Sequence, residues 1–222
     1  MTHTRWNQIV PACLFAAASG CALTSRSEPM QVRYFTLEDA ARSLPEARAN
    51  RSLEVRLGRV DASGDLGDEM AVRTGRNEIE YREDQRWTEK PEQFLRRGLE
   101  RALFQERGLT RAYSGIVPTL DVELVELAEV EGQPPKAQVR ALAHLHDDRR
   151  GLCDETFDVE QPISAADKEH ATQTVEALSS ALHTAINELS DKVVQCLSQV
   201  AEASKPAGPD ANGEKSERAA QP

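Results

Sequence analysis

Residues 137–145 read Ala-Gln-Val-Arg-Ala-Leu-Ala-His-Leu, with an apolar side chain at every odd-numbered position. A period of two is typical of a β-strand that turns one face to a core and the other to solvent. After turn residues at 147–151, Phe157 and Val159 continue the pattern on a partner strand. The sequence therefore predicts a hairpin here, and the neighbouring segments extend it into a sheet.

The segment before this hairpin shows the same alternation. Leu120, Val122 and Leu124 alternate with acidic residues, whereas Val125 and Leu127 take the opposite parity. A change of parity within one strand predicts a β-bulge, where one extra residue shifts the register. These segments together predict a three-stranded meander.

Further strands are expected nearer the N-terminus. Residues 32–37 are apolar and aromatic, and residues 53–57 alternate between apolar and charged side chains. A loop rich in turn residues follows at 61–68. Residues 70–81 then predict a hairpin that turns at Thr74-Gly75-Arg76-Asn77.

Two segments change to a helical period. Pro91 suits a first helical turn, and Gly108 suits a C-cap for a helix between them. Asp167 suits the N-cap of a last, long helix. That helix has a stripe of apolar residues on one face, namely Val175, Leu178, Leu182, Ile186, Leu189, Val193, Leu197 and Val200. We therefore predict an α+β fold of two layers, a mixed or antiparallel sheet with two amphipathic helices packed against it.

The N-terminus predicts a lipoprotein signal over residues 1–20. Arg5 supplies a positive charge, and the apolar run 9–18 has the length of a signal core and is too short to span a bilayer. Ala18-Ser19-Gly20-Cys21 reads as a lipobox, so Cys21 is expected to become the first mature residue and to carry the lipid. The alternative is an ordinary secretory signal in which Cys21 is incidental. Alanine rather than aspartate follows Cys21, which favours the outer membrane, with the protein facing the periplasm.

Composition divides the rest of the chain. Residues 21–30 are small and polar and predict a flexible tether, and residues 31–203 predict one α+β domain. Residues 204–222 lack large apolar side chains, so we expect a disordered tail. The formal net charge of −10 argues against nucleic acid as a partner and against electrostatic adhesion to anionic lipid.

Two cysteines remain after Cys13 leaves with the signal and Cys21 takes the lipid. Cys153 has the parity of the inward residues of its strand, and Cys196 follows Val193 by three residues on the flank of the apolar stripe. Both thiols should face the interface between sheet and helix, and an oxidising compartment favours a disulfide between them. The alternative is two buried free thiols, because cysteine also packs as a small hydrophobic residue.

Motifs for catalysis are absent from the sequence. It has no Gly-x-Ser-x-Gly elbow, no phosphate-binding glycine loop and no His-Glu-x-x-His. His144 and His146 share one strand face near Asp147 and Asp148, which could form half of a metal site, but a solvent-facing hairpin explains them as well. We expect neither an enzyme, nor a bound metal, nor a cofactor other than the lipid on Cys21.

Trp87 is the only tryptophan of the expected mature chain, and it follows Arg86 just before the first helix. One interpretation is an anchor that packs the start of the helix onto the sheet. The other is a contact with a partner, since tryptophan and arginine are enriched at interface hot spots. The sequence leaves both open.

The order of these motifs resembles the ABC-type transport auxiliary lipoprotein family, the PqiC-like components associated with MCE-protein lipid transporters. The resemblance depends on the lipobox, the strand Tyr34-Phe-Thr-Leu37, the strand Leu53-Glu-Val-Arg-Leu-Gly-Arg-Val60, and the hairpin 70–81 running through Arg86-Trp87 into the helix at Pro91. It covers roughly residues 31–203, with the most specific part at 53–104.

The resemblance implies a non-catalytic subunit of an envelope machine that moves lipid between two membranes. Its partners would be an MCE-domain protein and an inner-membrane ABC transporter, and the domain would dock alone or as a homo-oligomeric ring. Two alternatives stay open. One is a structural or assembly lipoprotein of another envelope complex, and the other is a periplasmic domain that binds lipid between sheet and helix.

Overall fold

The computed structural model describes residues 30–37, 53–164 and 170–204. The predicted signal, Cys21, the N-cap Asp167 and residues 205–222 of the expected tail lie outside the described residues, as does nearly all of the expected tether. The elements below belong to the compact unit that begins at Val32.

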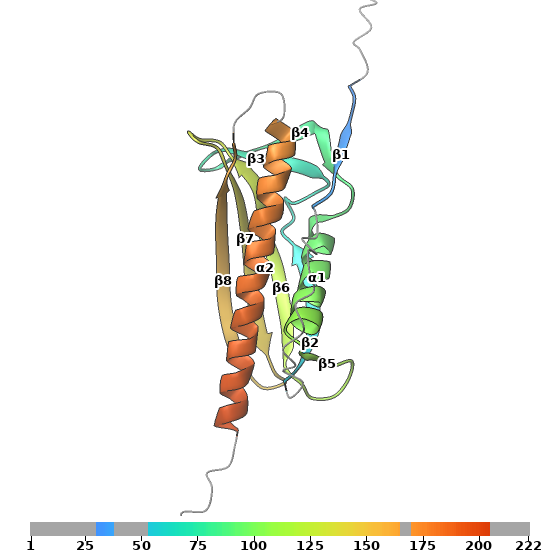
Figure 1. Cartoon of the computed structure of the whole chain (residues 1–222), viewed down its shortest axis with the longest axis vertical. Coiled ribbons are helices and arrows are strands. Elements are labelled where there is room, and N and C mark those ends of the chain that lie inside the picture. Colours follow the sequence, from blue (N-terminus) through green and yellow to red (C-terminus); the bar gives the residue numbers. More distant parts are fainter. Residues whose placement is uncertain (1–29, 38–52, 165–169, 205–222) are drawn as a thin grey trace, which may run out of the picture. The chain divides into compact units, whose positions relative to one another are not determined.

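The described elements follow the predicted order of strands, helix, strands, helix. The strands are β1 (Arg33–Phe35), β2 (Glu54–Ala62), β3 (Glu69–Gly75), β4 (Glu78–Trp87), β5 (Thr110–Arg111), β6 (Thr119–Val130), β7 (Lys136–His146) and β8 (Gly151–Pro162). The helices are α1 (Pro91–Glu100), the π-helical segment η1 (Arg101–Glu106) and α2 (His170–Ala203). Figure 1 shows α1 and α2 on the same face of the sheet. The predicted two-layer α+β fold with a mixed sheet is confirmed.

β6 is the centre of the sheet. On one side it pairs antiparallel with β7, and β7 with β8, which confirms the predicted meander. On its other side β6 pairs parallel with two strands in succession, with β2 along its first half and with β3 near its end. β4 then pairs antiparallel with β3, and β1 pairs parallel with β4. The parallel pairs make the sheet mixed.

The predicted bulge lies in β6. Its register against β7 shifts between Leu124 and Glu126. Leu124 pairs with Ala141 and Leu127 with Val139, so both leucines turn toward the helices although they lie three residues apart. The shift also turns Glu126 to the face opposite the helices.

Two elements differ from the sequence prediction. β4 continues to Trp87, so residues 82–87, expected as a connection, complete a strand. The helix that begins at Pro91 changes to π-helical geometry at Arg101, where the backbone N–H of Arg107 donates to the carbonyl of Ala102, five residues back. Gly108 follows with a φ of 67°, a left-handed conformation suited to a helix end.

The hydrophobic core lies between the sheet and the two helices. α2 contributes its predicted stripe, of which Leu178, Leu182 and Leu189 are at most 5% exposed. α1 packs close to α2 at Gly98, where a Cβ would collide with Cδ1 of Ile186. Among the described helices, none has both the length and the apolar character that a membrane span requires.

Candidate functional site

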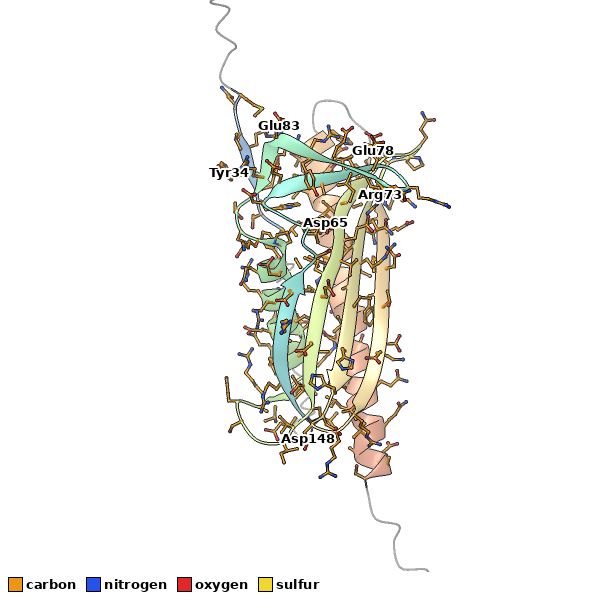
Figure 2. The ribbon with its side chains drawn as sticks, turned by 180° about the vertical axis from the view of Figure 1, so that it is seen from behind. Tyr34, Asp65, Arg73, Glu78, Glu83 and Asp148 are labelled. Atoms are coloured by element: carbon orange, nitrogen blue, oxygen red, sulfur yellow. A yellow bond between two sulfur atoms is a disulfide. The ribbon has the colours of Figure 1, made fainter. Side chains whose placement is uncertain are left out.

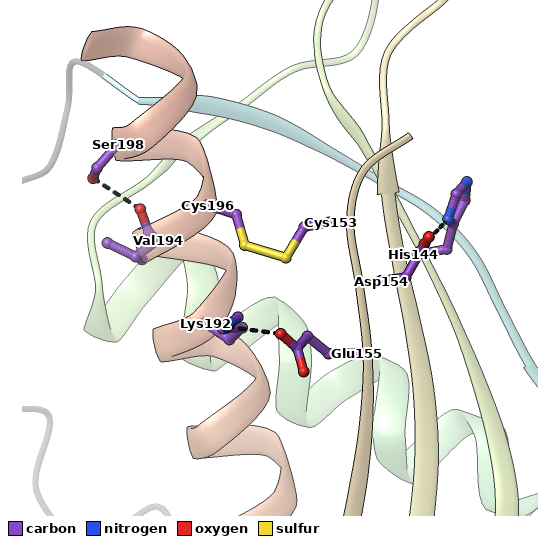
Figure 3. The surroundings of a disulfide bond; sticks show 8 residues. All are labelled: His144, Cys153, Asp154, Glu155, Lys192, Val194, Cys196 and Ser198. Carbon is purple, nitrogen blue, oxygen red and sulfur yellow. Dashed lines mark hydrogen bonds and ion pairs between the residues drawn. A yellow bond between two sulfur atoms is a disulfide. The ribbon is translucent and has the colours of Figure 1, made fainter. Parts of the chain in front are cut away.

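The two cysteines that were predicted to face the interface between sheet and helix are joined to each other. Cys153 of β8 and Cys196 of α2 form a disulfide, with 6.4 Å between their Cα atoms. Figure 3 shows the bond crossing from the strand to the helix, one turn from the ion pair between Lys192 and Glu155. The disulfide fastens the C-terminal half of α2 to an edge strand of the sheet.

Trp87 belongs to the core. It is 3% exposed, and its ring meets Phe94 of α1 edge to face at a centroid distance of 6.1 Å. Its backbone N–H donates to the carbonyl of Asp68 over 2.7 Å. Of the two interpretations of Trp87, the structure agrees with the anchor, because the buried indole packs the start of α1 onto the sheet.

Arg86 lies at the surface but is already paired. Its guanidinium donates to Asp68 over 3.1 Å and to Glu69 over 3.0 Å, and 35% of its side chain is exposed. Two carboxylates neutralise this cation within the chain. Arg86 therefore offers a partner less free charge than its place in the sequence indicates.

The two histidines of β7 share the helix-free face of the sheet, as their spacing predicts. Their rings stack at a centroid distance of 4.9 Å, His144 contacts Asp154, and His146 lies 3.2 Å from Oδ2 of Asp121. Each histidine is thus turned to its own carboxylate. Within the described part of the chain, no group of three or more His, Cys, Asp or Glu side chains is arranged to hold a metal ion.

The sheet face opposite the helices carries many charged side chains (Figure 2). Several of these charges pair with one another. Arg73 of β3 contacts Glu126 over 2.6 Å, and Arg140 of β7 lies 3.5 Å from Glu126 and 2.8 Å from Asp158. Partial burial alone would raise the pKa of Asp158, but hydrogen bonds from Gln138 and Arg140 outweigh it and lower that pKa. We interpret this ladder of alternating charges as a polar face that stabilises the sheet, with Glu126 buried between Arg73 and Arg140.

The two most exposed large apolar side chains of the described residues lie on the loop between β5 and β6. Tyr113 is 82% exposed and Ile116 is 80% exposed, and no other large apolar side chain of the described chain exceeds 66%. The loop reads Tyr113-Ser-Gly-Ile116. Tyrosine is a common anchor residue at protein interfaces. Sequence reasoning missed this loop, because two apolar residues among Ser and Gly give no periodic signal.

The base of this loop is held in place. Arg56 of β2 donates through Nη2 to the carbonyl of Gly115 over 2.9 Å, and its backbone N–H donates to the carbonyl of Pro118 over 2.9 Å. Gly115 has a φ of 92°, which favours glycine over any residue with a side chain. Tyr113 and Ile116 are thus presented from a fixed loop.

This loop and β1 lie at opposite ends of the fold. Figure 1 shows β1 at the upper end and β5, which leads into the loop, at the lower end. β6 starts just after the loop and pairs with β3 only at its last residues, Ala128–Val130. The twelve residues of β6 span about 40 Å.

The structure is thus a two-layer α+β domain with an exposed apolar loop at the end opposite its first described strand. Comparison with known families identifies it further. A model of the ABC-type transport auxiliary lipoprotein component matches residues 35–194, and the chain belongs to this family. The resemblance of the sequence to that family is confirmed.

Solved structures share the fold at low sequence identity. A Xanthomonas campestris protein of the DUF330 family is 19% identical, with a TM-score of 0.66, and the match covers 77% of this chain and 99% of that one. An uncharacterized protein is 15% identical, with a TM-score of 0.54, over 73% of this chain and 99% of that one. No functionally curated protein matches the chain.

Proposed function

We propose that this protein is the lipid-anchored docking subunit of an ABC transport system that works with an MCE-domain partner to move lipid between two membranes. The family supplies the association with ABC transport and the lipoprotein character. The lipid on Cys21 would hold the domain at the outer membrane, facing the periplasm. The domain itself would bind partners and needs neither a metal nor a cofactor for that task.

The observation that carries the proposal is the exposed loop at the end opposite β1. Two large apolar side chains, Tyr113 and Ile116, are held there at 82% and 80% exposure. Keeping such groups in water is unfavourable, and a docking partner would cover them. Because the tether leads into β1, the loop would extend away from the anchoring membrane and toward periplasmic subunits.

Substitution of the loop tests docking. Ile116→Asp should reduce at least tenfold the amount of MCE-domain protein and ABC permease that co-purifies from solubilised envelopes. Its unfolding midpoint should stay unchanged, since the Ile116 side chain is almost fully exposed. Leu142→Asp is the matched control, because Leu142 is 41% exposed on the opposite sheet face and should retain the partners.

The same purification separates the alternatives. Capture of transporter subunits that is equal in Ile116→Asp and in the unsubstituted chain would remove the loop from the proposal. Specific capture of an unrelated envelope complex would instead favour the structural or assembly role. A Cys21→Ser variant tests the anchor separately, and it should either accumulate as unprocessed protein or be released from the outer membrane into the periplasm.

A further inference from the structure

The turn between β7 and β8 lies beside the exposed loop between β5 and β6. Thr119, the first residue of β6, pairs in register with His146, the last residue of β7. The loop ends at Pro118 and the turn begins at Asp147, so each lies one residue beyond this pair. Figure 2 shows Asp148 of the turn at the lower end of the molecule, where Figure 1 shows β5. The two connections therefore belong to one end of the domain.

The turn between β7 and β8 exposes two arginines. The side chain of Arg149 is 85% exposed and that of Arg150 is 71% exposed. Asp147 holds the turn, because its carboxylate accepts hydrogen bonds from the backbone N–H groups of Arg149 over 2.8 Å and of Arg150 over 2.9 Å. These bonds lower the pKa of Asp147, so its carboxylate is ionised and engaged with the backbone. A held turn thus displays both guanidinium groups.

Neither guanidinium group is closely paired within the chain. Arg149 lies 3.9 Å from Asp148, and Arg150 lies 3.9 Å from Asp147. The guanidinium of Arg86, by comparison, donates to two carboxylates over 3.0 and 3.1 Å. Long, exposed ion pairs of this kind contribute little to stability. The N–H donors of Arg149 and Arg150 are therefore available to a partner.

Apolar and cationic groups meet at this end of the domain. The loop displays Tyr113 and Ile116, the two most exposed large apolar side chains of the described residues. The turn beside it displays two arginines and one exposed carboxylate, Asp148, which is 50% exposed. Tyrosine and arginine are both enriched among the residues that contribute most to protein interfaces. An apolar centre with a cationic border is the chemistry that this end offers.

The number of charges favours a protein partner over a membrane. Segments that bind anionic bilayers carry clusters of about four to eight lysines and arginines. The turn has two arginines and two aspartates, and the loop 112–118 has no charged residue. A guanidinium group instead binds a single carboxylate through two parallel N–H bonds, which needs a precisely placed partner. Individual Asp or Glu side chains of a folded partner meet that requirement.

We propose that the end formed by the loop 112–118 and the turn 147–150 binds an acidic surface of a protein partner. An apolar pocket of that surface would receive Tyr113 and Ile116, and carboxylates beside the pocket would bind Arg149 and Arg150. The inference rests on the proposed function, because it describes the partner of the docking loop. It adds the charge of that partner and a second contact segment. Opposite charges would also speed association in a salt-dependent way.

Photocrosslinking in intact cells tests the surface. A photoreactive aromatic residue replaces Tyr113 in one chain, Asp148 in a second and Arg76 in a third. Arg76 is exposed on the turn that follows β3, near the opposite end of β6, where β3 pairs with Ala128–Val130. Positions 113 and 148 should crosslink to the same protein, whereas position 76 should not crosslink to it. The crosslinked segments of the partner should contain Asp or Glu.

Charge reversal tests the chemistry of the contact. Arg149→Glu should lower the yield of the crosslink from position 113 about fivefold, and Arg149→Lys should lower it less because the charge remains. Arg76→Glu is the matched control, since it changes the net charge equally and should leave the yield unchanged. In opened envelopes, raising salt from about 0.1 M to about 1 M shortens the Debye length from about 10 Å to about 3 Å. This should weaken the crosslink of the unsubstituted chain more than that of Arg149→Glu.

Three results would overturn the proposal in chains with an unchanged unfolding midpoint. They are absence of a protein adduct at position 148, equal yields for Arg149→Glu and Arg76→Glu, or lipid adducts alone at positions 113 and 148. The last result would favour an anionic bilayer as the partner.

The same experiments separate this inference from the proposed function. A partner unrelated to ABC transport that crosslinks at both positions and depends on Arg149 would contradict the transport role and keep the acidic surface. A transporter subunit whose crosslink is lost in Ile116→Asp but retained in Arg149→Glu would keep the docking loop and overturn its acidic partner.

Discussion

Trp87 shows how a residue that is notable in the sequence can be structural. Its indole fills the junction between β4 and α1 against Phe94 and is 3% exposed. Trp87→Ala should lower the free energy of unfolding by about 3–5 kcal/mol, the usual cost of removing a large buried aromatic ring. Urea denaturation measures this directly. A loss below about 1 kcal/mol would contradict the core position.

The contribution of Asp158 to the free energy of unfolding depends on pH. Its pKa is lowered from the usual 3.8 in the folded chain, by hydrogen bonds from Gln138 and Arg140 that outweigh partial burial. Its contribution to stability is therefore present above pH 3.8 and is lost as pH falls through the lower, folded pKa. Its side chain is 41% exposed, so solvent screening limits the contribution to about 0.2–1 kcal/mol.

The test of Asp158 compares acid titrations of stability. The unsubstituted chain should lose more unfolding free energy on acidification than Asp158→Asn, and the two should converge at the lowest pH. Asp148→Asn is a control on the turn at the end of β7, where the side chain is 50% exposed. Parallel curves for the chain and Asp158→Asn would show that the hydrogen bonds to Asp158 add no pH-dependent stability.

At the scale of elements, the disulfide determines how firmly α2 is attached. Cys153 and Cys196 enclose a sequence separation of 43 residues, for which chain entropy alone predicts about 4 kcal/mol of stabilisation. A Cys153→Ala and Cys196→Ala double variant should lose about 2–4 kcal/mol. Hydrogen exchange should increase first in the last turns of α2. A uniform increase across the sheet would mean that the bond does not act locally.

Elements with local patterns could be predicted from the sequence, and pairings between distant segments could not. The alternation at 137–145 and the parity change after Leu124 gave the meander and its bulge, because both depend on neighbouring residues. The parallel pairing of β2 and β3 with one strand joins segments more than 50 residues apart, and no periodicity records it. The π-helical turn at Arg101 is also invisible, since its apolar residues keep a helical spacing.

The candidate sites also divide into one with a local sequence pattern and another that depends on the rest of the fold. The disulfide could be predicted, because Cys153 has the parity of the inward residues of its strand and Cys196 lies on the flank of the apolar stripe of its helix. The apolar loop at Tyr113 and Ile116 was missed because exposure depends on what the rest of the fold leaves uncovered.

For the whole molecule, the proposed function makes the distance between the membrane and the docking loop a property of both the tether and the domain. Residues 22–32 separate Cys21 from β1, and eleven residues extend at most about 40 Å. The loop at Tyr113 lies about 40 Å farther along β6. The reach of the docking loop from the membrane therefore depends on the length of the tether and hardly on its sequence.

A crosslinking experiment tests this dependence on length. A photoreactive amino acid at position 113 should crosslink to the MCE-domain protein in intact cells. Deletion of residues 24–29 should weaken the crosslink at least fivefold, since it removes about 20 Å of reach, whereas replacing the same residues with Gly and Ser should preserve it. Both variants should keep the same melting temperature, because the tether precedes the folded unit that begins at Val32. Equal crosslinking after deletion would show that the partner contacts the loop whatever the length of the tether. Loss of crosslinking in the Gly-Ser variant would show that the tether sequence itself is bound.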